Sequence, residues 1–224
     1  LPNLSKHIEK KNKNKINFIQ NKALELSLFL SLPACVALLI ASDEITSSLF
    51  GYGSFDILSV KNSAKALFYF ALGLPAFSLI KIFSSFIFAR HNTKTPFVFS
   101  ILSVILNILI SIYFFNKIGF IIIPIATTIS SWFNALILLI YLNNKNYFSL
   151  KSNFFSQLLK IIISTALSSY AFYVLIGYFA DNLSYESANK LITLILLNII
   201  TLIIYIVLSV LTKALKISDI KLKY

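Results

Sequence analysis

Residues 96–142 read PFVFSILSVILNILISIYFFNKIGFIIIPIATTISSWFNALILLIYL, and this stretch decides the fold class. It holds two apolar runs, Pro96–Phe115 and Gly119–Leu142, and its single charged residue is Lys117. Each run has about 20 residues or more, which is enough for a helix to cross a hydrocarbon core of about 30 Å. The short polar connection Asn116–Gly119 predicts a tight turn, so the stretch is expected to form a helical hairpin in a membrane.

Four more apolar runs of similar length occupy the rest of the chain. Because lipid leaves the backbone few ways to satisfy its hydrogen bonds, such runs predict helices. The chain is therefore expected to be an all-α, polytopic membrane protein with a basic lead-in (1–22), a six-helix lobe (23–212) and a basic tail (213–224). The helices are expected at 23–41, 64–89, 96–115, 119–142, 161–180 and 191–212.

The basic residues orient the predicted helices. Fifteen of the 20 lysines and arginines lie in the lead-in, in alternate connections or in the tail, four lie in the other connections, and Lys81 lies inside a span. The acidic residues Asp43, Glu44 and Asp56 share the connections that are poor in lysine. By the positive-inside rule the basic side is cytoplasmic. Both termini are then expected in the cytoplasm, which agrees with an even number of helices.

Composition excludes several classes of function. The net charge of +12 could suggest nucleic-acid binding, but apolar residues make up 58% of the chain and the lysines flank the spans. Those lysines fit anionic lipid headgroups better. Cys35 is alone, and His7 and His91 have no cysteine nearby, so we expect no metal site and no cofactor. No acid–base pair or activated nucleophile can be assembled, so we do not expect an enzyme.

The beginning of the sequence is unusual for an open reading frame. The chain starts at Leu1 and contains no methionine. Residues 1–22 are polar and lysine-rich, and they do not have the pattern of a signal peptide. We therefore expect either that the start has been removed or that the chain is a piece of a longer protein.

Small and helix-breaking residues predict features inside the spans. Gly73 and Pro75 predict a kink near residues 72–75. Ala126, Ser130 and Asn134 recur at four-residue spacing on one face of a helix, which is typical of a helix–helix contact.

A series of motifs at the ends of the spans resembles one family when taken in order. The chain resembles the C-terminal part of the MurJ (MviN) family of lipid II flippases, and the resemblance is strongest over residues 1–142. The motifs are Leu1-Pro2-Asn3-Leu4-Ser5, Leu32-Pro33-Ala34, Leu49-Phe50-Gly51-Tyr52-Gly53-Ser54-Phe55-Asp56, Tyr69-Phe70-Ala71-Leu72-Gly73-Leu74 and Phe88-Ala89-Arg90-His91-Asn92-Thr93-Lys94-Thr95-Pro96.

The resemblance implies a cellular location, a substrate and a partner for the chain. Members of the family have 14 helices in two lobes, in a superfamily that also exports drugs and polysaccharide lipids. They move the undecaprenyl-linked peptidoglycan precursor, lipid II, across the bacterial inner membrane by alternating access, which supports cell-wall biogenesis and cell shape. The six spans here would be helices nine to fourteen, the N-terminal lobe would be the partner, and Na⁺ or the membrane potential would supply energy. Two alternatives stay open: a non-transporting scaffold or relic of a split gene, and a lobe of a related exporter.

Three residues are candidates for substrate binding. Lys81 lies within a span, where ionisable groups usually face a cavity or a partner, so it could attract an anionic headgroup. The alternative is that Lys81 extends to the interface. Arg90 is either a gating contact or a positive-inside anchor. Asn134 is either a cavity residue or part of the helix contact.

The resemblance also suggests a cation site. Some members of the family bind sodium with residues of the third and fourth spans here and of an earlier helix. Asn107, the carbonyl of Ile123 and Thr127 match that pattern, whereas Ser111 stands where the family has an Asp. Losing a carboxylate weakens a site for a hard cation, so interhelical hydrogen bonding is the alternative for these residues.

Overall fold

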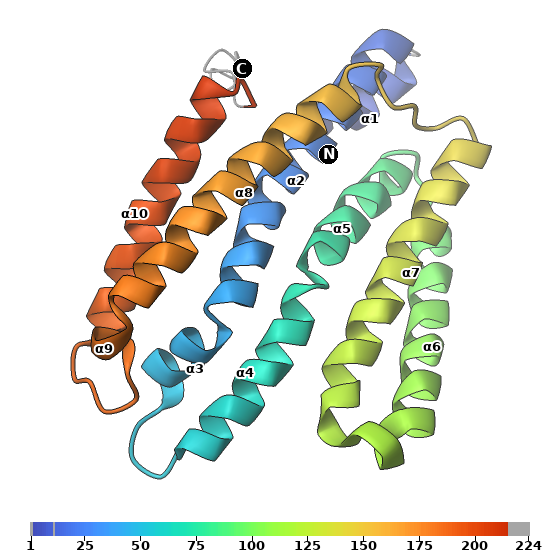
Figure 1. Cartoon of the computed structure of the whole chain (residues 1–224). Coiled ribbons are helices and arrows are strands. Elements are labelled where there is room, and N and C mark those ends of the chain that lie inside the picture. The colour runs from blue at the N-terminus through green and yellow to red at the C-terminus, as the bar shows by residue number, and fades with distance from the viewer. Residues whose placement is uncertain (1, 11, 215–224) are drawn as a thin grey trace. The chain divides into compact units, whose positions relative to one another are not determined.

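The computed structural model describes residues 2–10 and 12–214, and within these ranges it contains helices and no β-strand (Figure 1). The predicted all-α class is therefore confirmed. The chain divides into two compact units. Unit 1 comprises the described residues within 1–31 and 72–155, and unit 2 comprises the described residues within 32–71 and 156–214. Most of the predicted tail 213–224 lies outside the described residues.

Ten α-helices and one 3₁₀ turn make up the described part of the chain. They are α1 (Pro2–Glu9), α2 (Lys13–Ile40), α3 (Ser42–Phe50), α4 (Ile57–Ala71), α5 (Leu74–Phe88), α6 (Lys94–Ile118), η1 (Gly119–Ile121), α7 (Ile122–Asn144), α8 (Phe154–Tyr178), α9 (Ala180–Leu183) and α10 (Lys190–Leu211).

Unit 1 is organised around α7, which packs against both α5 and α6. Helices α6 and α7 lie side by side along their length in Figure 1. Ala126, Ser130 and Asn134 are all buried, which confirms the predicted contact face. The hydroxyl of Ser103 on α6 donates to the carbonyl oxygen of Ser130 at 2.6 Å. Small residues let the two backbones approach closely enough for this bond.

The connection between α6 and α7 is a tight turn, as predicted. Gly119 has a φ of +73°, in the left-handed region that glycine adopts without steric cost. Among the described residues, five segments are long and apolar enough to cross a membrane, and one of them, Lys94–Asn144, contains both helices of this hairpin. The number of crossings and the side of each terminus stay predictions.

The predicted kink is a complete break between two helices. Helix α4 ends at Ala71, and α5 begins at Leu74 with Pro75 in its first turn. Proline has no N–H to continue the preceding helix and its fixed φ suits the start of a new one. The indole Nε1 of Trp132 donates to the carbonyl oxygen of Leu72 at 3.0 Å, so a carbonyl at the break is satisfied from α7.

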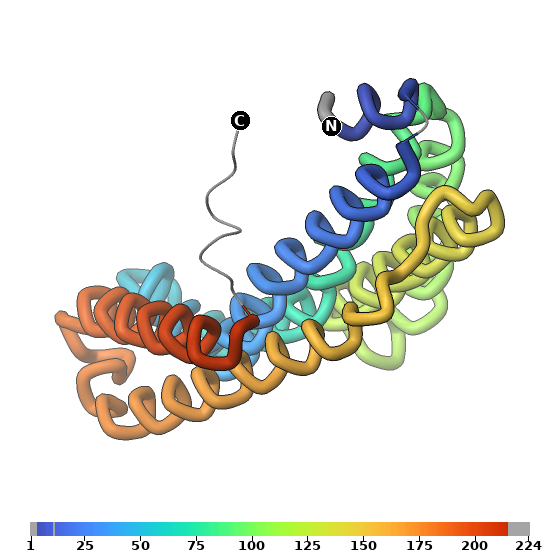
Figure 2. Tube along the Cα trace, turned by 90° about the horizontal axis from the view of Figure 1, so that it is seen from above, coloured from blue at the N-terminus to red at the C-terminus, as the bar shows by residue number. Residues whose placement is uncertain are grey.

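Unit 2 has its core where α8, α9 and α10 meet the end of α2. Helices α8 and α10 run in opposite directions and are connected through α9 (Figure 2). Helix α3 contacts both α4 and α10. The buried core residues are Ala41, Phe172, Ile176, Leu183, Leu194 and Leu197.

Three helices begin well before the residues that hydropathy predicts. Helix α2 starts at Lys13 rather than at residue 23, α4 starts at Ile57 rather than at residue 64, and α8 starts at Phe154 rather than at residue 161. In α2 the reason is visible, because Gln20 and Asn21 are buried and bind other parts of unit 1. Hydropathy marks the apolar part of a helix and not its hydrogen-bonded polar end.

Candidate functional site

The loop Asn146–Lys151, called the 146–151 loop below, connects α7 to α8 and is held by side chains from α2 and α5. The carbonyl oxygen of Tyr147 accepts two hydrogen bonds, from Gln20 Nε2 at 3.0 Å and from Arg90 Nη2 at 2.7 Å. Asn146 has a φ of +54°, a conformation that asparagine tolerates better than most residues. The loop therefore has a defined path.

Asn21 fixes the same loop at two further points. Its Oδ1 accepts from the backbone N–H of Lys151 at 3.0 Å, and its Nδ2 donates to the carbonyl oxygen of Ser149 at 2.9 Å. Gln20 and Asn21 both have 0% of their surface exposed. Buried amides need hydrogen-bond partners. Many of the partners of these two amides are backbone groups of the 146–151 loop.

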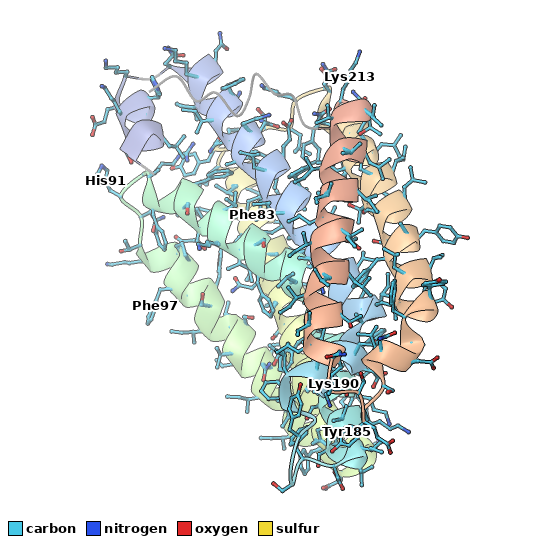
Figure 3. The ribbon with its side chains drawn as sticks, turned by 90° about the vertical axis from the view of Figure 1, so that its left-hand side faces the viewer. Phe83, His91, Phe97, Tyr185, Lys190 and Lys213 are labelled. Carbon is cyan, nitrogen blue, oxygen red and sulfur yellow. The ribbon has the colours of Figure 1, made fainter. Side chains whose placement is uncertain are left out.

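Aromatic contacts complete the attachment. The ring of Phe148 lies 5.7 Å from that of Phe86 and 6.2 Å from that of Phe83, measured between centroids. Figure 3 shows Phe83 on α5. The guanidinium carbon of Arg90 lies 4.4 Å from the centre of the Tyr147 ring, which is a favourable cation–π distance.

Arg90 is half-buried and forms no ion pair with any of the described residues. Its Nη1 also donates to the carbonyl oxygen of Phe86, so its described partners are neutral. Burial lowers the pKa of the Arg90 guanidinium, because desolvation disfavours the charged form. Arginine nevertheless remains charged at any physiological pH.

Beside Arg90 lies a cavity of about 510 Å³, called the basic cavity below, in which both charged side chains are cationic. Its lining residues belong to α1, α2, the turn after α5, the end of α7 and the 146–151 loop. They are Ile8, Lys13, Ile16, Asn17, Arg90, Asn143, Asn146, Tyr147, Phe148 and Ser149.

The other two substrate-binding candidates lie elsewhere in unit 1. Lys81 is exposed in the middle of α5 and forms no ion pair within the described ranges. Asn134 is only 6% exposed, and its Oδ1 has no hydrogen-bond partner there. Asn134 therefore lies in the packed helix contact in this structure.

The residues of the cation pattern are brought together. Asn107 Nδ2 donates to Thr127 Oγ1 at 3.0 Å, and Thr127 Oγ1 donates to the carbonyl oxygen of Ile123 at 2.8 Å. Ser111 Oγ is buried without a partner among the described residues. The groups bind one another and include no carboxylate, so on their own they do not fit a hard-cation site.

Unit 2 contains a buried lysine at the end of the connection that the sequence predicts before the last span, 191–212. Lys190 is 1% exposed, and its Nζ donates to the carbonyl oxygens of Gly51 and Tyr185, both at 2.7 Å. The rings of Tyr52 and Tyr185 lie 4.2 and 4.7 Å from the same atom. Figure 3 shows Lys190 and Tyr185 together at the start of α10. This cage joins the loop after α3 to the loop before α10.

A smaller cavity of about 270 Å³ in unit 2 is lined by Asp43, Glu44 and Lys61, among others. Burial raises the pKa of the Glu44 carboxyl, and the nearby Asp43 charge adds to the effect. No group of three or more potential metal ligands occurs in the described ranges.

Comparison with known proteins places the chain in a family. The sequence model described as "Lipid II flippase MurJ" matches residues 1–196, which is most of the chain. The chain belongs to the MurJ family. The match extends into α10, beyond the residues 1–142 that carry the clearest motifs.

MurJ relatives are substantially longer than this chain. "Probable lipid II flippase MurJ" of Rhizobium meliloti (strain 1021) is 34% identical over 184 residues, covering 82% of this chain and 34% of that protein. The protein of the same name from Rickettsia prowazekii (strain Madrid E) is 31% identical, with coverages of 83% and 37%. The chain thus spans about a third of the length of these curated relatives.

A solved MurJ structure is similar to this chain in fold. "Lipid II flippase MurJ, inward closed conformation" matches with a TM-score of 0.74 and 26% identity over 94% of this chain and 41% of that one. Together with the membrane-length helices, this makes the chain a multi-pass protein of the bacterial inner membrane. The family name describes a transporter and not an enzyme.

Proposed function

We propose that the chain acts as the C-terminal lobe of a flippase for lipid II, the undecaprenyl-linked peptidoglycan precursor. The observation that supports this most is the match of the MurJ sequence model over residues 1–196. Transport would follow alternating access, in which two lobes rock around a central cavity. Half of such a cavity cannot alternate, so an N-terminal lobe is needed as partner, in the same chain or a separate one.

Complementation tests this function. The chain is expressed in bacteria depleted of their own lipid II flippase, with and without an N-terminal lobe from a MurJ relative, and both lobes are detected in the membrane. Growth with both lobes and lysis with either alone is the expected result. Lysis in every combination, with both lobes present, would favour a non-transporting scaffold instead.

Lys81 is the residue we propose to attract the anionic head of the substrate. Its exposure in the middle of α5 supports this, because an ammonium at membrane depth is costly unless it faces water or a partner. Lys81→Ala should then reduce transport and Lys81→Arg should retain most of it. Unchanged transport in Lys81→Ala, with a correctly inserted protein, would show that Lys81 only extends to the interface.

For Asn107 and Thr127 we propose interhelical hydrogen bonding as the main role. The bond of 3.0 Å between their side chains supports it. Sodium could bind only if another part of the transporter supplied the missing carboxylate. Transport that rises with sodium in the two-lobe assembly, and loses that rise in Asn107→Ala, would establish such a site.

A further inference from the structure

The basic cavity of unit 1 has an electrostatic imbalance that the proposed transport function does not explain. Its two charged lining residues are Lys13 and Arg90, and its other polar lining side chains are neutral. A half-buried charge without a counter-ion is unfavourable, and Arg90 finds only carbonyl oxygens and an aromatic ring in the described chain. An anion in the cavity would supply the missing counter-charge.

The walls of the cavity are also held in place by hydrogen bonds. Arg90 is held from both sides by the carbonyl oxygens of Phe86 and Tyr147. The wall contributed by the 146–151 loop is fixed by the buried amides of Gln20 and Asn21. A cationic group held in advance loses little conformational entropy when a ligand binds, which strengthens binding.

The lining matches one class of anion. Lys13 and Arg90 supply positive charge, and the side chains of Asn17, Asn143, Asn146 and Ser149 supply neutral hydrogen-bonding groups. Phosphate oxygens are bound by this combination of charged and neutral donors. A volume of about 510 Å³ lies within the range of about 300–1,000 Å³ that is usual for small-molecule sites.

We infer that the basic cavity of unit 1 binds a phosphate-bearing anion, with Lys13 and Arg90 neutralising its charge. The ligand is either the phosphate headgroup of an anionic lipid or a free phosphate species, since both present the same oxygens. Lys13 begins α2, a membrane-length helix, so the cavity lies where a headgroup could reach it. This inference concerns binding alone and does not depend on transport.

The test uses the purified full chain in neutral detergent and two kinds of probe. A short-chain phosphatidylglycerol represents the lipid, inorganic phosphate and pyrophosphate represent free phosphate, and short-chain phosphatidylcholine is the zwitterionic control. Saturable binding is measured by thermophoresis at low and high salt. Binding of phosphatidylglycerol alone identifies a lipid as the source, whereas binding of the inorganic anions as well shows that the phosphate is sufficient.

Two lysines provide a matched pair of variants. Lys13 lines the cavity, whereas Lys15 is also exposed on the same helix and does not line it. Lys13→Gln should weaken binding about tenfold, as expected for losing one charge-assisted contact, and Lys15→Gln should change it little. Circular dichroism and gel filtration verify that each variant is folded.

Several results would overturn the inference. They are the absence of saturable binding by any phosphate probe to the folded chain, equal losses in Lys13→Gln and Lys15→Gln, and equal affinity for phosphatidylglycerol and phosphatidylcholine. Arg90→Gln should also weaken binding, but this substitution loosens the 146–151 loop as well, so a loss of binding would have two causes. The result for Lys13→Gln therefore decides the test.

Discussion

Arg90 Nη2 lies 2.7 Å from the carbonyl oxygen of Tyr147, while the guanidinium carbon lies 4.4 Å from the centre of the ring of the same residue. A single side chain thus binds both the backbone and the ring of one loop residue. The planar guanidinium is suited to this because it donates in its plane and stacks through its face. A lysine has the charge but not the geometry.

Arg90→Lys should therefore loosen the 146–151 loop. The expected loss is about 1–3 kcal/mol of stability, because a lysine ammonium lacks the planar geometry that lets Arg90 donate to two carbonyl oxygens while it stacks on the Tyr147 ring. Hydrogen exchange of residues 146–151 and the thermal midpoint are the measurements. Lys94→Arg is the control, since Lys94 is exposed. If both variants exchange at the wild-type rate, Arg90 is not what holds the loop.

Lys190→Met should separate the two loops that Lys190 joins. The substitution keeps the apolar stem but leaves the carbonyl oxygens of Gly51 and Tyr185 without this donor. An unsatisfied buried acceptor costs about 1–3 kcal/mol. Faster hydrogen exchange is expected over residues 51–56 and 184–190. Lys65→Met, at an exposed position of α4, should leave both loops unchanged, and a similar response to both substitutions would argue against a specific cage.

Glu44→Gln should change how stability depends on pH. Burial raises the pKa of Glu44 in the folded chain. The contribution of this carboxyl to the stability of the fold is therefore complete at low pH, where it is protonated, and is lost as pH rises through the raised pKa. The Gln variant should be more stable than wild type at neutral pH and equal to it in acid. Thermal unfolding between pH 3 and about pH 8 measures this. A constant difference across the range would assign the effect to packing.

Asp56→Asn should show the opposite trend. At the start of α4 the Ser59 side chain, and also its backbone N–H at 2.8 Å from Oδ1, hydrogen-bond to the Asp56 carboxylate, and these bonds lower the pKa of the carboxyl. Its contribution is present above the unfolded-state pKa and is lost as pH falls through the lowered value. The Asn variant should therefore be less stable at neutral pH, with the gap closing in acid. A gap that widens in acid would contradict the capping role.

Asn107→Ala should weaken the α6–α7 hairpin modestly. Interhelical hydrogen bonds in membrane proteins contribute about 0.6 kcal/mol on average and at most about 1.7 kcal/mol. Unfolding in mixed micelles measures the loss, and a double-mutant cycle with Thr127→Val isolates the bond between the two side chains. A coupling energy of zero would show that their 3.0 Å contact contributes nothing.

Features that depend on local chemistry could be predicted from the sequence. The hairpin of α6 and α7, the break at Gly73 and Pro75 and the buried face of Ala126, Ser130 and Asn134 each follow from residues close together in the chain. Apolar length and turn residues suffice for such features.

The polar attachments could not be predicted in the same way. Lys190 binds the carbonyl of Gly51, which lies 139 positions earlier, and Asn21 binds a loop 128 to 130 positions later. A carbonyl acceptor exists at every residue, so the sequence does not indicate which one a side chain will find. The available signals were weak: two adjacent amides at 20 and 21 before an apolar run, and a lysine at the first position of an apolar helix.

If this chain supplies one lobe of a lipid II flippase, lipid II should cross a membrane only when both lobes are present. Labelled lipid II is placed in vesicles that contain the chain, an N-terminal lobe from a MurJ relative, or both, and its accessibility to an impermeant outer-leaflet reagent is followed over time. We predict transfer with both lobes and none with either lobe alone. Equal transfer by the chain alone, or no transfer by a stable two-lobe assembly, would contradict it.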